Sequence, residues 1–236
     1  MLRFILTFML LSTCFFSFSQ TEIIRKSDKQ FPVPGNDFAF IEAATDTNTL
    51  EFVATFKSDV KASEGIQAAY FSIQEQAGKI GANTFRLNHY SRNDSSNTLT
   101  LILDTYYGSD SAKMVNFNHH EETAFIIFGD ENPNGEKTYS FKVNGKKKEF
   151  KSGTYFKYIL KEGEQVKINK GGISGMSIWF NYEKGSKATH LTMTGLGLGG
   201  GPVPGDVVGI AVNTGRFRHV PGDLGCLLKN ILKQSE

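Results

Sequence analysis

Hydrophobic positions recur along the chain with two different periods, and each period predicts one kind of element. The helical period is clearest between Ser63 and Gly81, where apolar side chains fall on one face over about four turns. These side chains are Ile66, Ala69, Tyr70, Ile73, Ala77 and Ile80. Ser63 is the candidate N-cap, and Gly81 stands where a left-handed residue would end the helix.

Alternation of apolar and polar residues predicts strands on both sides of this helix. The predicted strands cover residues 38–42, 50–56, 84–90 and 98–107, and the last two are joined by a polar turn. Strand, helix and hairpin together indicate a small α+β domain over residues 38–115. Residues 20–37 contain Pro32 and Pro34 and are expected to be an extended lead-in, with ordered structure beginning near Phe38.

Beyond a polar linker at residues 116–122, short strands separated by turns replace the mixed pattern. They cover residues 123–128, 137–143, 146–150, 154–160, 166–169, 177–182 and 189–194, with an Asn144-Gly145 hairpin turn. Regular strands of this kind predict an antiparallel β-sandwich domain over residues 123–222. The predicted fold class is therefore α+β, a small helix-and-sheet domain followed by a sandwich.

The last part of the chain combines a glycine-rich segment with a short helix. Glycine and proline interrupt residues 195–222, where residues 207–212 could still form a final strand. In residues 223–236 the apolar side chains of Leu224, Leu227, Leu228, Ile231 and Leu232 have helical spacing, and Asp223 is placed to cap the helix.

Two segments carry a resemblance to known families. The run from Ala77 to Phe85, a helix closing on Gly-Ala-Asn before a strand, resembles the domains of YbjQ-like proteins and of the stress-sensing outer-membrane lipoprotein of the Rcs pathway. The chain lacks the paired cysteines of that sensor, so its disulfides and signalling role are not implied. Residues 144–166 resemble transthyretin-like and DUF2846-like sandwich domains in their strand and turn rhythm.

The first residues indicate export. Arg3 is followed by a short apolar run and small residues at Ser17 and Ser19, which predicts a signal peptide over residues 1–19. The run is shorter than the roughly 20 residues that a membrane-spanning helix needs. The alternative is lipidation of Cys14, which would anchor the protein to the outer membrane. We expect a periplasmic or secreted protein with no transmembrane span.

Net charge and cysteine content limit the classes of function that the chain could have. The chain has 26 basic and 24 acidic side chains and a formal net charge of +2, so bulk charge gives no support for nucleic-acid binding. After cleavage Cys226 is the remaining cysteine, and no intrachain disulfide can form. The main interpretation is a buried thiol in a docking helix, and the alternative is a reactive thiol or an intermolecular disulfide.

No set of residues converges on a reaction. The residues His119, His120, Glu121 and Glu122 are consecutive and cannot close on one ion, so we expect a solvated linker and no metal site there. Residues His89, His190 and His219 are single, and Ser152, Ser174 and Thr189 lack a nucleophile motif. Prolines follow the glycine run at residues 195–201, which argues against phosphate binding. We expect no cofactor, and an enzyme would need a pocket lined by His190, His219 or Cys226.

Binding to an envelope component is the function that the sequence favours. The lysines Lys142, Lys146, Lys147, Lys148 and Lys151 surround the Asn144-Gly145 turn, with Tyr155 and Phe156 nearby in sequence. They could contact anionic glycans or lipid headgroups, although charge on an edge strand also prevents aggregation.

Trp179, Tyr155 and Tyr158 could form a carbohydrate-binding face, although a tryptophan on an apolar strand is usually core. We expect a non-enzymatic module that binds an envelope protein, glycan or lipid headgroup. The alternative is an extracytoplasmic hydrolase or carbohydrate-binding protein.

Overall fold

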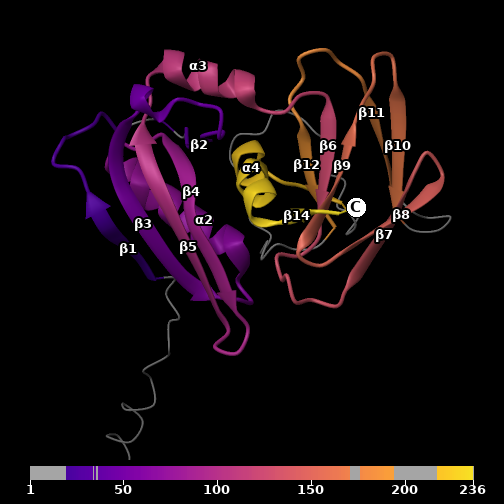
Figure 1. Cartoon of the computed structure of the whole chain (residues 1–236), viewed down its shortest axis with the longest axis horizontal. Helices are drawn as coiled ribbons and strands as arrows, with labels where there is room; N and C mark the ends of the chain where they lie inside the picture. The colour runs from indigo at the N-terminus through magenta and orange to yellow at the C-terminus, as the bar shows by residue number, and fades with distance from the viewer. Residues whose placement is uncertain (1–19, 34, 36, 171–175, 194–216, 236) are drawn as a thin grey trace, which may run out of the picture.

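The computed structural model describes residues 20–33, 35, 37–170, 176–193 and 217–235, and these residues form three β-sheets and three α-helices (Figure 1). The chain has an α+β structure. The predicted export signal, the predicted strand at residues 207–212 and most of the glycine-rich segment lie outside the described residues. In the part of the chain that is described, no helix is long and apolar enough to cross a bilayer.

The first unit is a five-stranded sheet with a helix on one face. Its strands lie in the order β1 (Gln20–Lys26), β3 (Glu51–Lys61), β5 (Thr98–Tyr107), β4 (Thr84–Asn93) and β2 (Ala39–Phe40). The four predicted strands and the hairpin are confirmed. The lead-in prediction was wrong, because residues 20–26 form an edge strand antiparallel to β3. Only Thr21 in β1 is even half-buried, so this strand shows no apolar alternation.

Helix α2 (Gly65–Lys79) packs on this sheet through its predicted apolar face. Gly81 ends the helix with φ = +92°, and a Cβ there would lie 2.5 Å from Cβ of Phe31. The predicted cap at Ser63 was wrong, since the N-cap residue is Glu64 and makes no side-chain cap. The buried carboxylate of Glu131, which follows β6 (Ala124–Phe128) in the second unit, instead accepts a hydrogen bond from the N–H of Ile66 at 3.3 Å. A group from the second unit therefore stabilises a helix start in the first.

Asn83 fixes the turn after β5 and supports a stability prediction. Its side chain accepts from the N–H of Gly108 at 2.7 Å and donates to the C=O of the same residue at 2.8 Å, and both residues are buried. We expect Asn83→Ala to lower the free energy of unfolding by about 2 kcal/mol, because it leaves buried backbone groups without a partner. Asn93→Ala on the exposed turn is the control, expected within about 0.5 kcal/mol of wild type in urea titrations. Equal effects of the two changes would contradict this role.

The second unit contains two sheets. One has the order β11 (Met176–Asn181), β10 (Gln165–Lys170), β7 (Thr138–Val143) and β8 (Lys146–Lys151). The other has the order β13 (Arg218–His219), β12 (Thr189–Thr192), β6 (Ala124–Phe128), β9 (Thr154–Ile159) and β14 (Lys233–Gln234). Each strand predicted in this region is present. The all-antiparallel prediction was wrong for the second sheet, because β12 runs parallel to β6 and β14 runs parallel to β9.

A hydrophobic core lies between these two sheets. Phe125 of β6 stacks on Phe180 of β11 at 4.5 Å between ring centroids, and Phe141 of β7 meets Phe156 of β9 at 5.1 Å. Alternate residues of β6 and β12, such as Phe128 and His190, face the other way, toward α4. Strands β6 and β12 of this sheet are therefore buried on both faces.

The remaining helices connect the two units. Helix α3 (Asp110–His119) extends into the predicted linker and covers its first half. Its N-terminus is capped by the side chain of Ser109. Helix α4 (Gly222–Ile231) lies between the two units in Figure 1, and its leucines pack against both. The predicted cap at Asp223 was wrong: Pro221 is the N-cap, and the half-buried Asp223 carboxylate accepts a hydrogen bond from the N–H of Phe40 at 2.8 Å. The helix that the sequence predicted over residues 223–236 is confirmed as far as Ile231, and β14 follows it in place of a last helical turn.

Candidate functional site

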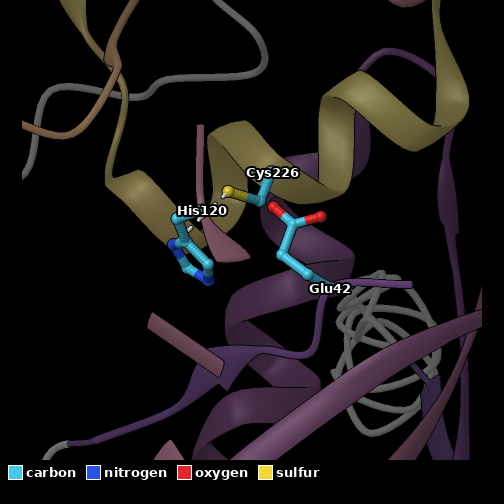
Figure 2. A group of neighbouring side chains, drawn as sticks. All are labelled: Glu42, His120 and Cys226. Carbon is cyan, nitrogen blue, oxygen red and sulfur yellow. Dashed lines mark hydrogen bonds between the residues drawn. The ribbon is translucent and has the colours of Figure 1, made fainter. Parts of the chain in front are cut away.

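Glu42, His120 and Cys226 meet at the junction of the two units. Glu42 follows β2, His120 is the C-cap residue of α3, and Cys226 lies in the middle of α4. One ligand atom from each residue lies within 4.8 Å of the others, and Sγ of Cys226 is 4.0 Å from Nδ1 of His120. Figure 2 shows the three side chains close together, with the sulfur of Cys226 on the side of His120.

Asn116, which is buried on α3, holds this arrangement in place. Its Oδ1 accepts hydrogen bonds from the N–H of Glu42 at 2.9 Å and from Oγ1 of Thr45 at 2.8 Å. Its Nδ2 donates to the C=O of Phe40 at 2.7 Å. The same amide therefore fixes the backbone at Glu42 and the end of β2.

The orientation of His120 determines which ring nitrogen faces the thiol. Nε2 lies 3.3 Å from the C=O of Phe40 and 3.4 Å from Nδ2 of Asn116. It donates to the carbonyl in one tautomer and accepts from the amide in the other. In the tautomer with the proton on Nε2, the lone pair of Nδ1 is directed toward Cys226. A histidine that donates one ring N–H to a backbone carbonyl and offers the other nitrogen is the usual arrangement at protein metal sites.

The charges around the cluster keep the thiol protonated. Burial raises the pKa of Cys226 far above its ordinary value, and the Glu42 carboxylate raises it further. Lys229 lies 4.0 Å from Oε1 of Glu42 and 3.3 Å from Oε2 of Glu121. Burial favours the neutral amine of Lys229, but these two carboxylates raise its pKa. The atom Oε1 of Glu42 is buried and makes no hydrogen bond among the described residues.

This chemistry does not suit nucleophilic catalysis by Cys226. A reactive cysteine needs a lowered thiol pKa and partial exposure, whereas Cys226 is 3% exposed and its pKa is raised. Sulfur, imidazole nitrogen and carboxylate oxygen are, however, the three donor types that bind zinc, and a bound ion displaces the thiol proton. Metal binding is therefore the chemistry that the cluster can support.

The other sequence candidates do not join the cluster. His119 is exposed and lies 3.0 Å from Oγ1 of Thr45, while Glu121 pairs with Lys157 and Glu122 pairs with Lys187. The four consecutive residues thus diverge, as expected, but His120 meets two residues that are distant in sequence. His190 is buried under α4, and His89 and His219 are exposed.

The hydroxyl candidates also lie apart from the thiol. The hydroxyl of Ser152 donates to Oδ2 of Asp130 at 3.1 Å and is buried, and Thr189 lies at the start of β12, whereas Ser174 lies outside the described residues. The enzyme hypothesis needed Cys226, His190 and an acid in one cleft, but the histidine beside the thiol is His120.

A shallow groove of about 600 Å³ lies elsewhere, beside β1 and β3. Arg25, Lys29, Glu51 and Phe52 are among its lining residues. Lys29 forms an ion pair with Glu51 at 2.7 Å, and the Arg25 guanidinium stacks 4.2 Å from the ring centroid of Phe52. These two cations are engaged within the protein, so the groove is a weaker candidate than the buried cluster.

Comparison with known proteins adds little to this description. No protein-family model matches the chain, and no curated protein matches its sequence. Among solved structures, 38% of the chain is similar to 98% of the chain of the Francisella virulence factor FvfA, with 9% sequence identity and a TM-score of 0.32. A likeness at this level establishes neither fold nor function.

Proposed function

We propose that this protein is an exported, non-enzymatic envelope protein that binds a single divalent zinc ion through Glu42, His120 and Cys226. The observation that carries the proposal is the convergence of one sulfur, one nitrogen and one oxygen donor within 4.8 Å. The Phe40 carbonyl beside Nε2 of His120 supports it, because a proton held on Nε2 would leave Nδ1 to bind the ion.

The spacing of the donors is close to that of a zinc site. Zinc bonds of about 2.3 Å to sulfur and about 2.0 Å to nitrogen at a tetrahedral angle place the two atoms about 3.6 Å apart. The observed distance between Sγ and Nδ1 is 4.0 Å, so a small rotation of one side chain closes the site. Oε1 of Glu42 lies 4.0 Å from Lys229 but makes no hydrogen bond among the described residues, and it would become a ligand at the same time.

Binding is favoured over hydrolysis by the burial of the donors. Three protein ligands leave a fourth position for water, as in zinc hydrolases. Cys226 is only 3% exposed and the Glu42 side chain only 15% exposed, which leaves little surface for an envelope polymer to reach an ion. The hydrolase alternative therefore has weaker support than a binding role.

The export and architecture in this proposal have their own support. Residues 1–19 have the charge and apolar run of a secretory signal, with the lipid anchor at Cys14 as the alternative. The shared core of the two sheets in the second unit supports a β-sandwich there, one with a mixed sheet.

Competition between the purified protein and a chromophoric zinc chelator tests the proposal. We expect one ion per chain, and His120→Gln should weaken binding by at least about 100-fold, since even outer-shell changes cost about 10- to 100-fold. The matched control is His119→Gln, which changes the adjacent exposed histidine and should bind as wild type. Equal affinities of the two variants, or binding of no ion by a folded wild-type protein, would contradict the proposal.

A further inference from the structure

The outer face of the four-stranded sheet carries polar and cationic side chains that the buried cluster does not use. Strand alternation places the apolar residues of β7 and β10 toward the core and their neighbours outward. The outward residues are Thr138, Ser140 and Lys142 on β7, Lys147, Glu149 and Lys151 on β8, Gln165, Lys167 and Asn169 on β10, and Ser177, Trp179 and Asn181 on β11. We call this set the outer face.

Trp179 is the single large apolar side chain of the outer face. It is 55% exposed, which corrects the expectation of a core tryptophan. It stands opposite Lys167 in the strand register, and the Lys167 ammonium lies 5.0 Å from its ring centroid. Exposing an indole to water costs free energy, so a half-exposed ring beside hydrogen-bonding groups is typical of a contact surface.

Register aligns the other groups into a row beside Trp179. Ser177 pairs with Asn169, Asn169 with Lys142, and Lys142 with Lys147. Four strands spaced about 4.8 Å apart make this row roughly 14 Å long. Amide, hydroxyl and ammonium groups therefore lie side by side along one line across the sheet.

Charge selects an anionic ligand for this face. It holds four lysines and one glutamate, and the glutamate is already paired with Lys147 at 2.6 Å. The aromatics that the sequence placed beside these lysines are a different set, since Tyr155 and Phe156 belong to β9 in the other sheet. The aromatic side chain that shares the outer face with the lysines is Trp179 on β11.

Protection of a sheet edge explains only part of this arrangement. The edge strands of the sheet are β8 and β11, and lysines on β8 would discourage pairing with another chain. Lys142 and Lys167 lie on the two inner strands, where there is no edge to protect. An exposed tryptophan on edge strand β11 is the opposite of a protective residue.

We propose that the outer face binds an anionic polysaccharide, with Trp179 against the apolar face of a sugar ring and Lys142, Lys151 and Lys167 near its acidic groups. Gln165 donates to Asn181 at 2.7 Å and Asn169 donates to Ser177 at 3.1 Å. A side-chain amide has more donor and acceptor sites than one such bond uses, so this row suits a ligand rich in hydroxyl groups. A lipid surface would call for several apolar side chains that insert, and this face offers one. The proposal is independent of the metal site.

Affinity electrophoresis and calorimetry with polygalacturonate, dextran sulfate and neutral dextran test this proposal. We expect binding to at least one of the two anionic polymers and none to neutral dextran. Trp179→Ala should weaken binding about tenfold. Lys142→Ser combined with Lys151→Ser should weaken it about tenfold and flatten its salt dependence.

Matched controls keep the result specific. Ile159→Ala removes a similarly exposed apolar side chain from the other sheet, and Lys161→Ser combined with Lys184→Ser removes two exposed lysines outside the outer face. These variants, and Cys226→Ser, should bind the polymer as wild type. Equal losses in control and face variants, no binding to either anionic polymer, or binding to phosphatidylglycerol vesicles in place of the polymers would each overturn the proposal.

Discussion

Acidification from pH 6.5 should destabilise the protein by about 1.4 kcal/mol per pH unit through His190 alone, down to about pH 3. His190 is 4% exposed, and neither of its ring nitrogens has a hydrogen-bond partner among the described residues. Burial, and then the charges of Lys229 on α4, His219 on β13 and His120 after α3, lower its pKa from 6.5 to about 3.

The sign follows from where the proton binds. Below pH 6.5 the unfolded chain takes up a proton at His190, whereas the folded protein keeps this ring neutral until about pH 3. Acid therefore favours the unfolded state, and the loss from this one group reaches about 5 kcal/mol at the lower end of the window. Other groups titrate in the same range, so the contribution of His190 must be measured by comparing the pH dependence of stability in wild type and in a variant without this histidine.

His190→Leu isolates this difference. The variant should match or exceed wild type in stability at neutral pH, because it removes two buried nitrogens that have no partner. Its urea midpoint should fall much less between pH 6.5 and 4.5 than that of wild type. The control is His89→Leu at an exposed position, and it should keep the full acid sensitivity. If the urea midpoints of wild type and His190→Leu fall in parallel as the pH is lowered, His190 is not the source of the acid sensitivity.

A methyl group at Gly225 should destabilise the protein by about 3 kcal/mol, at the upper end of the cost of overpacking a core. A Cβ there would lie 2.6 Å from both Cδ2 and Nδ1 of His190. The ring cannot move away easily, because it stacks on Phe128 and sits on a central strand of its sheet. Helix α4 would have to shift, and Cys226 with it.

Two comparisons separate this clash from the general effect of glycine in a helix. Gly78 lies in α2 with open space around it, so Gly78→Ala should stabilise by up to about 1 kcal/mol through helix propensity. His190→Ala should suppress much of the cost of Gly225→Ala, a coupling that a double-mutant cycle in urea detects. Additive effects of the two changes would contradict the packing described for α4.

Periodicity predicted the elements whose burial is one-sided. The strand at residues 98–107 alternates so regularly that its predicted bounds equal those observed, and α2 shows both its apolar face and its terminal Gly81. The edge strand β1 was missed because it is held by backbone pairing and buries almost no side chain. Strand β14 was missed because it has two residues, both exposed, and is held by backbone pairing with β9.

The candidate site was beyond the sequence for a different reason. Cys226 and His120 are 106 residues apart, and they meet only because α4 inserts between the two units. Glu42 carries no local signal, since it is one of many acidic residues that follow a short strand. The residues next to His120 in the sequence give no sign of a shared site, because its partners follow β2 and lie on α4. Of the three residues in the cluster, Cys226 is the one whose burial could be predicted, because it lies in a leucine-rich amphipathic helix.

Cobalt titration followed by absorption spectroscopy tests the proposed metal site most directly, because tetrahedral Co²⁺ bound to a thiolate gives a sulfur-to-metal charge-transfer band. The wild-type protein should develop this band to saturation at one ion per chain and lose it when Zn²⁺ is added. Cys226→Ser should show no such band while remaining folded. If the folded wild-type protein develops no thiolate band, Glu42, His120 and Cys226 do not form a metal site. The same conclusion follows if the Cys226→Ser variant shows the band as strongly as wild type.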